Sequence, residues 1–319
     1  MRFLADIPAI PAGDECPSPH AILSVRVDPP PLSAFAGGER AFLQSLTAQY
    51  QLSVTHLNAF LNVANGGPHR FLEQCLLRFP QAKSPSACYG SAMHAAIEAM
   101  QARFKGSGTL PLADDVIGFF ENALSRERLA PHDTKALLGR GTKALAVFYA
   151  AKRDSFGRDD LIEMNFKREG VIVSGASLTG KIDRIVFSGA TGAVAHDLKT
   201  GKPAATWEGK DAHKKILLHG YRRQLLFYKL RIERSRTFRG RTVDSGVLDF
   251  MEPDKAGTIV DLSLAIDPGE AVRLERLIGA VWKRIQTLDF PDISAYPKDL
   301  SGIIAFEEDI LAGETAQAY

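Results

Sequence analysis

The spacing of hydrophobic residues changes once along the chain, near residue 159, and this change restricts the fold more than any other feature. Before it, apolar residues recur every three or four positions, as in helices, over 55–79, 91–104, 114–129 and 133–153. After it, apolar and polar residues alternate in short runs separated by glycines, as in strands. The chain is therefore expected to be mainly helical first and to form a sheet afterwards.

The second half predicts a sheet with helices beside it. The strand-like runs are LIEMNF (161–166), VIVSGASL (171–178), TGKIDRIVF (179–187), AVAHDLKT (193–200), 245–251 and 258–264. Helical spacing returns at 211–235 and again at 268–288. The order of helices, strands, helix, strands and helix indicates an α/β sheet with an N-terminal helical region.

This order divides the 319 residues into three expected regions. Residues 1–50 are rich in proline and have no sustained periodicity, which predicts a loop-rich leader. Residues 51–158 form the helical region, and residues 159–319 form the α/β core with its C-terminal helices. The length suits one elaborated domain or two modest ones.

Composition excludes several classes of protein. The formal net charge is only +2, so global charge indicates no particular partner. The three cysteines, Cys16, Cys75 and Cys88, are odd in number and lack the spacing of a zinc site, which favours a reducing compartment. Asp6 interrupts the apolar stretch that a signal peptide needs, and no segment offers about 18 apolar residues to span a bilayer. We expect a cytoplasmic protein without membrane contacts.

A phosphate-binding loop is suggested by Gly175 to Lys181, which match the pattern GxxxxGK. Such a loop needs Ser or Thr next, to hold magnesium, and a helix must follow. Ile182 stands at that position, and the residues after it alternate as in a strand. We therefore expect no bound nucleotide.

Two carboxylates and an amine lie on neighbouring predicted strands. Asp197 and Lys199 point to one face, because strand side chains alternate, and they converge with Asp183 if Asp183 shares that face. Hard divalent cations bind carboxylate oxygens, and a nearby ammonium could orient a nucleophile, so the set suits phosphodiester hydrolysis. The alternative is a solvated strand end with a surface ion pair worth about 0–1 kcal/mol.

The helix predicted at 211–235 is basic. The segment from Lys214 to Arg241 holds ten Lys or Arg and one acid, and Gln224 and Tyr228 share one helical face. Aromatic and basic side chains are interleaved, as expected where a nucleic-acid strand is bound; the candidates are Tyr221, Arg222, Arg223 and Lys229. The alternative is a solvated basic face around an apolar stripe.

Two further titratable residues lie in regular segments. His94 is in GSAMHAAIE, a helix of small residues, where a lone histidine is more often a satisfied core residue than a ligand. Glu163 is an acid between the apolar neighbours of LIEMNF, where it could simply face solvent. Neither residue indicates a function without a partner.

Taken in order, GSAMHAAIE, LIEMNF, LTGKIDRIVF, HDLKTGK and RRQLLFYKL resemble the successive motifs of the PD-(D/E)xK nuclease superfamily. The likeness runs from about residue 52 to 310 and is strongest to the RecB-like and AddB-like nuclease modules at the C-terminus of UvrD-type helicases. It implies a restriction-endonuclease-like fold, with a mixed central sheet flanked by helices. It also implies a metal-dependent DNA nuclease, an exonuclease on single-stranded DNA that acts with a helicase in DNA repair or recombination.

The resemblance also implies a role for each matched residue. His94, Asp183 and Asp197 would bind Mg²⁺ or Mn²⁺, and Lys199 would position the attacking water. Among the catalytic residues it further places Gln224 and Tyr228, which would support the site and contact DNA, and it gives Glu163 a weaker correspondence to an accessory acid.

The chain departs from these relatives in two respects. AddB-like members bind an iron–sulfur cluster through cysteines, but no cysteine follows Cys88, so no cluster is expected. No helicase motor is present, so unwinding of DNA duplex ends would need a UvrD-like helicase in cis or in trans; the opening RFLADIP resembles the tail of such a motor. The alternative function is a non-catalytic DNA-binding module of a helicase–nuclease complex. The presence of Asp183, Asp197 and Lys199 together favours the nuclease.

Overall fold

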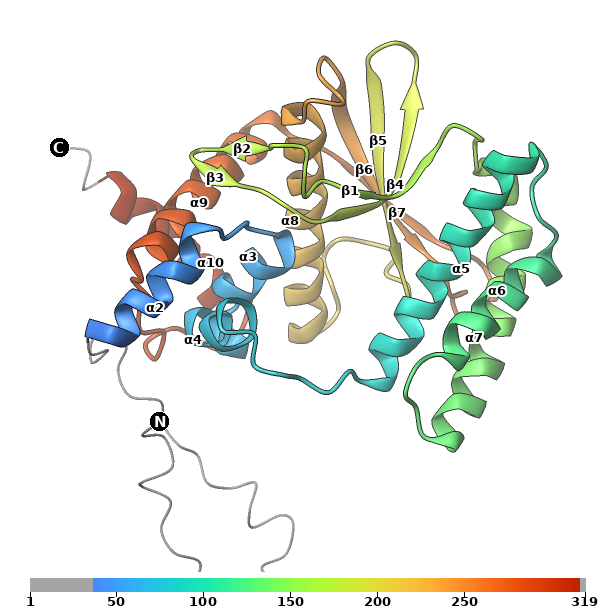
Figure 1. Ribbon diagram of the computed structural model, residues 1–319, viewed down its shortest axis with the longest axis horizontal. Coiled ribbons are helices and arrows are strands. Elements are labelled where there is room, and N and C mark those ends of the chain that lie inside the picture. The colour runs from blue at the N-terminus through green and yellow to red at the C-terminus, as the bar shows by residue number, and fades with distance from the viewer. Residues whose placement is uncertain (1–36, 316–319) are drawn as a thin grey trace, which may run out of the picture. The chain divides into compact units, whose positions relative to one another are not determined.

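The computed structural model describes residues 37–315 (Figure 1). The chain divides into two units, residues 1–41 and 42–319, and the described residues lie almost entirely in the second. The first 36 residues of the expected leader lie outside the described residues. Gly37–Ala48 form helix α2, so helical structure begins earlier than the expected boundary at residue 51.

The core of the second unit is a five-stranded sheet in the order β1-β4-β5-β6-β7. Neighbouring strands are antiparallel except β5 and β6, which run parallel, so the sheet is mixed and confirms the predicted fold class. The strands are β1 (Leu161–Asn165), β4 (Lys181–Ser188), β5 (Gly192–Lys199), β6 (Thr242–Phe250) and β7 (Asp261–Ala265).

Helix α8 (Ala212–Arg234) connects the two parallel strands, as such a pair requires a crossover. The helix begins where Asp211 accepts a hydrogen bond from the Lys214 amide at 2.8 Å. It packs on β5 and β6, and Gly246 allows the close approach, since a Cβ there would lie 3.0 Å from Leu225. Helices α9 (Pro268–Thr287) and α10 (Leu300–Thr315) pack beside α8.

The predicted helical region separates into two groups in space (Figure 1). The first packs with α8, α9 and α10. It contains α3 (Val54–Leu61), η2 (Val63–Asn65), α4 (Gly67–Phe71) and η3 (Leu72–Leu76). The second group shares an apolar cluster with Leu198 and Met251 of the sheet side. It contains α5 (Pro85–Ser107), α6 (Ala113–Ser125), α7 (Pro131–Lys152) and the turn η4 (Arg153–Ser155). Within residues 37–315, no helix combines the length and the apolar character needed to cross a membrane.

The run VIVSGASL does not join the central sheet, contrary to the prediction that its residues form a strand of that sheet. It forms a short hairpin of two strands with two residues each, β2 (Ile172–Val173) and β3 (Ala176–Ser177). Ser174 and Gly175 both have positive φ, 46° and 81°, as a tight hairpin turn requires. The turn therefore ends the alternating run before it can add to the sheet.

The GxxxxGK segment is not a phosphate loop in this fold. Lys181 begins strand β4, and the chain continues as a strand to Ser188 rather than as a helix. Gly180 has a φ of 124°, and a Cβ there would lie 2.6 Å from the guanidinium of Arg231. The glycine therefore serves the packing of Arg231 against this turn.

Candidate active site

The candidate site lies where strands β4 and β5 separate. Their pairing ends at Arg184 and His196, although β5 stays paired with β6 as far as Lys199 and β4 stays paired with β1 as far as Lys181. Beyond that point the amide of Leu198 donates to Asp183 Oδ2 at 2.8 Å. The carboxylate of Asp183 thus occupies the opening between the two strands.

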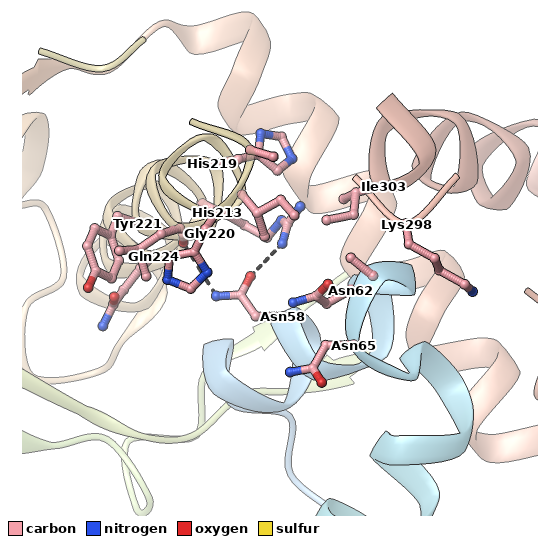
Figure 2. Close-up of a pocket in the computed structure, with 15 residues that line it drawn as sticks. Asn58, Asn62, Asn65, His213, His219, Gly220, Tyr221, Gln224, Lys298 and Ile303 are labelled. Atoms are coloured by element: carbon pink, nitrogen blue, oxygen red, sulfur yellow. Dashed lines mark hydrogen bonds between the residues drawn. The ribbon is translucent and has the colours of Figure 1, made fainter. Parts of the chain in front are cut away.

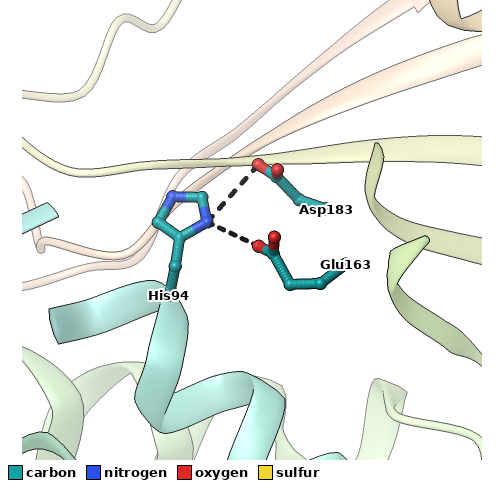
Figure 3. Close-up of side chains that lie close together, drawn as sticks. All are labelled: His94, Glu163 and Asp183. Carbon is teal, nitrogen blue, oxygen red and sulfur yellow. Dashed lines mark hydrogen bonds and ion pairs between the residues drawn. The ribbon is translucent and has the colours of Figure 1, made fainter. Parts of the chain in front are cut away.

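Three side chains converge at this opening (Figure 3). His94 Nδ1, from α5, lies 3.1 Å from Glu163 Oε1 of β1 and 3.8 Å from Asp183 Oδ2 of β4. The other ring nitrogen of His94 lies 3.1 Å from the carbonyl oxygen of Leu198. Each of the three side chains offers one atom that can bind a metal, and these three atoms all lie within 4.8 Å of one another. They are close enough to bind a common metal ion. His94 is therefore a member of a site and not an isolated core histidine.

The backbone of Glu163 is strained. Its φ is 53° in the middle of β1, although the residues on either side keep one register with β4, Ile162 opposite Arg184 and Met164 opposite Ile182. A left-handed conformation costs a residue with a Cβ about 1–3 kcal/mol, and such strain clusters at functional sites. The motif resemblance assigned Glu163 only a weak role, and strand alternation could not reveal a φ that tertiary packing imposes.

A second group of polar side chains lies on the α8 side of the sheet. Asp197, which is 1% exposed, accepts hydrogen bonds at Oδ1 from Tyr228 (2.6 Å) and Gln224 (2.7 Å). Lys199 Nζ lies 2.6 Å from Asp197 Oδ2 and donates to Gln224 Oε1 at 2.9 Å. Because Gln224 and Tyr228 are four residues apart on α8, both side chains reach the carboxylate of Asp197 on β5.

Glu163 lies with two of the expected ligands, His94 and Asp183, and the metal-binding role of Asp197 stays a prediction. Among the described residues, the group able to share an ion consists of His94, Glu163 and Asp183, and Asp197 lies outside it. Asp197 Oδ2 is buried and takes no hydrogen bond besides its ion pair with Lys199. Glu163 therefore joins the centre of the site, and Asp197 borders it through Lys199.

Burial and neighbouring charges shift the pKa values of these groups. Burial, with the nearby carboxylate of Asp197, raises the pKa of Asp183 to about 7. Burial lowers the pKa of His94, but the carboxylates of Glu163 and Asp183 outweigh it, and the net pKa is raised. Burial likewise opposes the charge of Lys199, but Asp197 holds its pKa above the usual value. The positive charges of His94 and Lys199 thus compensate the carboxylates that lie close together at the site.

The donor set fits a hard divalent cation. It offers carboxylate oxygens and one imidazole nitrogen, the ligands that Mg²⁺ and Mn²⁺ accept, in a pocket with two lysines close by. One of these, Lys181, pairs with Glu163 at 3.3 Å. The residues that would hold the ion are His94, Glu163 and Asp183.

Arg231 fixes the start of β4 and thereby the position of Asp183. The residue is 1% exposed, and its guanidinium donates to the carbonyl oxygens of Thr179 (3.2 Å) and Lys181 (2.8 Å). It also lies over the rings of Phe166 and Tyr228. Burial lowers the pKa of Arg231 to about 10. This basic residue of α8 thus serves the architecture of the site.

The expected DNA-binding residues of α8 are largely paired within the protein. Arg222 pairs with Glu270 at 2.6 Å, Lys229 pairs with Glu233 at 2.6 Å, and the buried Arg223 pairs with Glu307. Tyr221, in contrast, lies at the site, with its ring centre 4.0 Å from Lys199 Nζ. The DNA contacts of these residues remain a prediction, and the ion pairs reduce the charge that Arg222, Arg223 and Lys229 can offer to phosphates.

The chain is similar to one family of known proteins and, more distantly, to two solved structures. The family model of the PD-(D/E)XK nuclease superfamily matches residues 51–300. The solved structure of a candidate exonuclease from Eubacterium rectale is 11% identical, with a TM-score of 0.46, and the alignment covers 81% of this chain and 88% of that one. The solved structure of the protein SSO0001 is 15% identical, with a TM-score of 0.27 and coverages of 79% and 87%. No curated protein matches the sequence.

Fold and site together define an α/β protein whose mixed sheet carries a histidine and acidic residues at an opening between two strands. The matched region contains the whole sheet and all the site residues described above. The chain belongs to the PD-(D/E)XK nuclease superfamily. Nucleases of this superfamily use divalent metals, in agreement with the donor set of the site.

Proposed function

We propose that the protein is a metal-dependent deoxyribonuclease that hydrolyses phosphodiester bonds of single-stranded DNA, as an exonuclease. The observation that supports this most is the convergence of His94, Glu163 and Asp183 at the strand opening, beside the ion pair of Asp197 and Lys199. A module that only binds DNA would not need acidic side chains that converge with a histidine beside a half-buried lysine.

Each residue has a task in this proposal. His94, Glu163 and Asp183 hold Mg²⁺ or Mn²⁺, which polarises a phosphate and lowers the pKa of a water molecule when bound. Lys199 orients the attacking water and stabilises developing negative charge with its ammonium. Asp197 holds Lys199 in place.

Gln224 and Tyr228 act through Asp197 and are therefore positioning residues. Both donate to the same carboxylate oxygen, Asp197 Oδ1, and Gln224 also accepts from Lys199. These three contacts fix the Asp197 carboxylate and the Lys199 ammonium relative to each other. The Lys199 side chain is therefore already held in one position before a phosphate of the DNA binds, and no further ordering of it is needed.

The test is cleavage of end-labelled DNA, single-stranded and duplex, in Mn²⁺ or Mg²⁺ and in EDTA. We expect the parent to cleave the single strand in metal only, and Lys199→Ala to fold normally but to lose at least 100-fold in rate, because it lacks the ammonium. Lys143→Ala, at an exposed position of α7, is the matched control. Equal rates for parent and Lys199→Ala would refute the assigned role.

The second candidate function is a non-catalytic DNA-binding module of a helicase–nuclease complex. The same cleavage assay distinguishes this module from the nuclease. Binding of DNA without cleavage in any metal would favour the module. The RecB-like or AddB-like affiliation and a UvrD-like helicase partner are part of the proposal and rest on the motif resemblance. A helicase partner predicts that duplex ends become substrates when ATP and a helicase of that type are added.

A further inference from the structure

A cavity of about 530 Å³ lies beside the proposed active site, between helices α3 and α8. Figure 2 shows Tyr221 and Gln224 at one end of it and Lys298 at the other. Those two residues of α8 also contact Lys199, through the Tyr221 ring and the Gln224 amide. Two residues that line the cavity therefore also contact the proposed catalytic lysine.

Amide side chains line one wall of this cavity. Asn58 is held in place, because its amide donates to the Gly220 carbonyl at 3.4 Å and its oxygen accepts from Arg223 at 2.5 Å. Asn62, in contrast, has a buried Oδ1 without a hydrogen-bond partner among the described residues. A buried acceptor left unsatisfied costs about 1–3 kcal/mol, which a ligand with an N–H donor would recover.

The remaining lining is basic and apolar. Within the described part of the chain, none of the residues that line the cavity is acidic. Of the four basic lining residues, His219 and Arg223 pair with the buried Glu307, whereas His213 and Lys298 form no ion pair with a carboxylate of the described residues. Leu217 adds apolar surface. Lining of this kind suits a ligand with a flat apolar body, polar edges and a negative charge, and the volume is that of a small-molecule pocket.

We propose that this cavity binds one unpaired nucleotide of the DNA strand, next to the phosphate that reaches Lys199. The inference rests on the proposed function, because it takes the strand to pass Lys199. The base lies against Tyr221 and Leu217, and an amino group on its pairing edge donates to Asn62 Oδ1. Since a paired base has already used that edge, the cavity selects single strands over duplexes.

The test is DNA binding in EDTA, where no cleavage occurs, by fluorescence anisotropy of a labelled 12-nucleotide strand and of the blunt duplex of the same sequence. Asn62→Leu removes the unsatisfied acceptor, and Ala212→Trp adds bulk at the exposed first residue of α8, which also lines the cavity. Asn122→Leu, on exposed α6 surface, is the matched control. We expect both cavity variants to bind the single strand about fivefold more weakly than the control, with duplex binding unchanged.

Equal single-strand affinity of Ala212→Trp and Asn122→Leu would overturn the proposal, as would an equal loss for duplex and single strand, or a parent that binds no single strand. Ala212→Trp deletes no internal contact of the core, so the result stands even if Asn62→Leu does not fold. This test fails independently of the nuclease proposal. If the parent cleaves DNA and Lys199→Ala does not, the nuclease proposal holds even when the cavity variants bind DNA as well as the control.

Discussion

Glu307 illustrates how single residues hold the molecule together beneath the site. Its carboxylate is 1% exposed and accepts from His219 (2.8 Å), Arg273 (3.0 Å) and the buried Arg223. Burial alone would raise the pKa of Glu307, but Arg223, His219 and Arg273 together lower it from 4.5 to about 2. The ion pairs thus stabilise one wall of the cavity, since Arg223 also holds Asn58.

The lowered pKa gives a prediction for stability against pH. A carboxyl whose folded pKa lies below its unfolded value stabilises the fold above about pH 4.5, and this contribution is lost as pH falls towards 2. The shift corresponds to about 3 kcal/mol at neutral pH. We expect Glu307→Gln to be less stable than the parent by at least this amount in urea unfolding at pH 7, with the difference shrinking below pH 4.5.

The matched control is Glu308→Gln, whose side chain is 60% exposed and pairs with Arg273 at the surface. A surface pair contributes about 0–1 kcal/mol, so this variant should follow the parent at every pH. A difference between Glu307→Gln and the parent that stays constant from pH 7 to pH 2.5 would contradict the electrostatic account.

At the scale of elements, α8 shows what the sequence could and could not predict. Spacing predicted a helix over 211–235, and the structure has it at Ala212–Arg234. The alternation of β5 predicted that Asp197 and Lys199 share a face, and they do. The basic composition of α8 did not reveal which charges are paired, because the partners Glu270 and Glu307 come from helices far along the chain.

The first turn of α8 gives a prediction for DNA binding. Among the described residues, no carboxylate forms an ion pair with Lys214 or Lys215 there, beside the cavity. If each meets one phosphate, replacing both by Gln lowers the slope of log affinity against log salt by about 1.4 for a single strand. Anisotropy titrations across a range of salt concentrations measure the slope. An unchanged slope would remove this turn from the DNA path, and Arg234→Gln, already paired with Glu275, is the control.

At the scale of the whole molecule, the site is assembled from segments that lie far apart in sequence. His94 comes from a helix in the first half, and Glu163, Asp183 and Asp197 come from three different strands. Hydrophobic periodicity predicted these helices and strands, and the motif resemblance predicted which of their residues belong to one site. Periodicity could not predict that the helices of 51–158 separate into two groups, or that Asn58 and Lys298 line one cavity, because these depend on contacts between distant segments.

The central claim, that the acids and the histidine at the strand opening hold a common divalent ion, is tested most directly by titrating Mn²⁺ against the protein and following free Mn²⁺ by electron paramagnetic resonance. We predict saturable uptake by the parent and at least tenfold weaker uptake by Asp183→Asn, which keeps the shape of the side chain but removes its charge. Asp154→Asn, at a position 92% exposed, should bind as the parent does. Equal uptake by Asp183→Asn and the parent, or no uptake by either, would contradict the account.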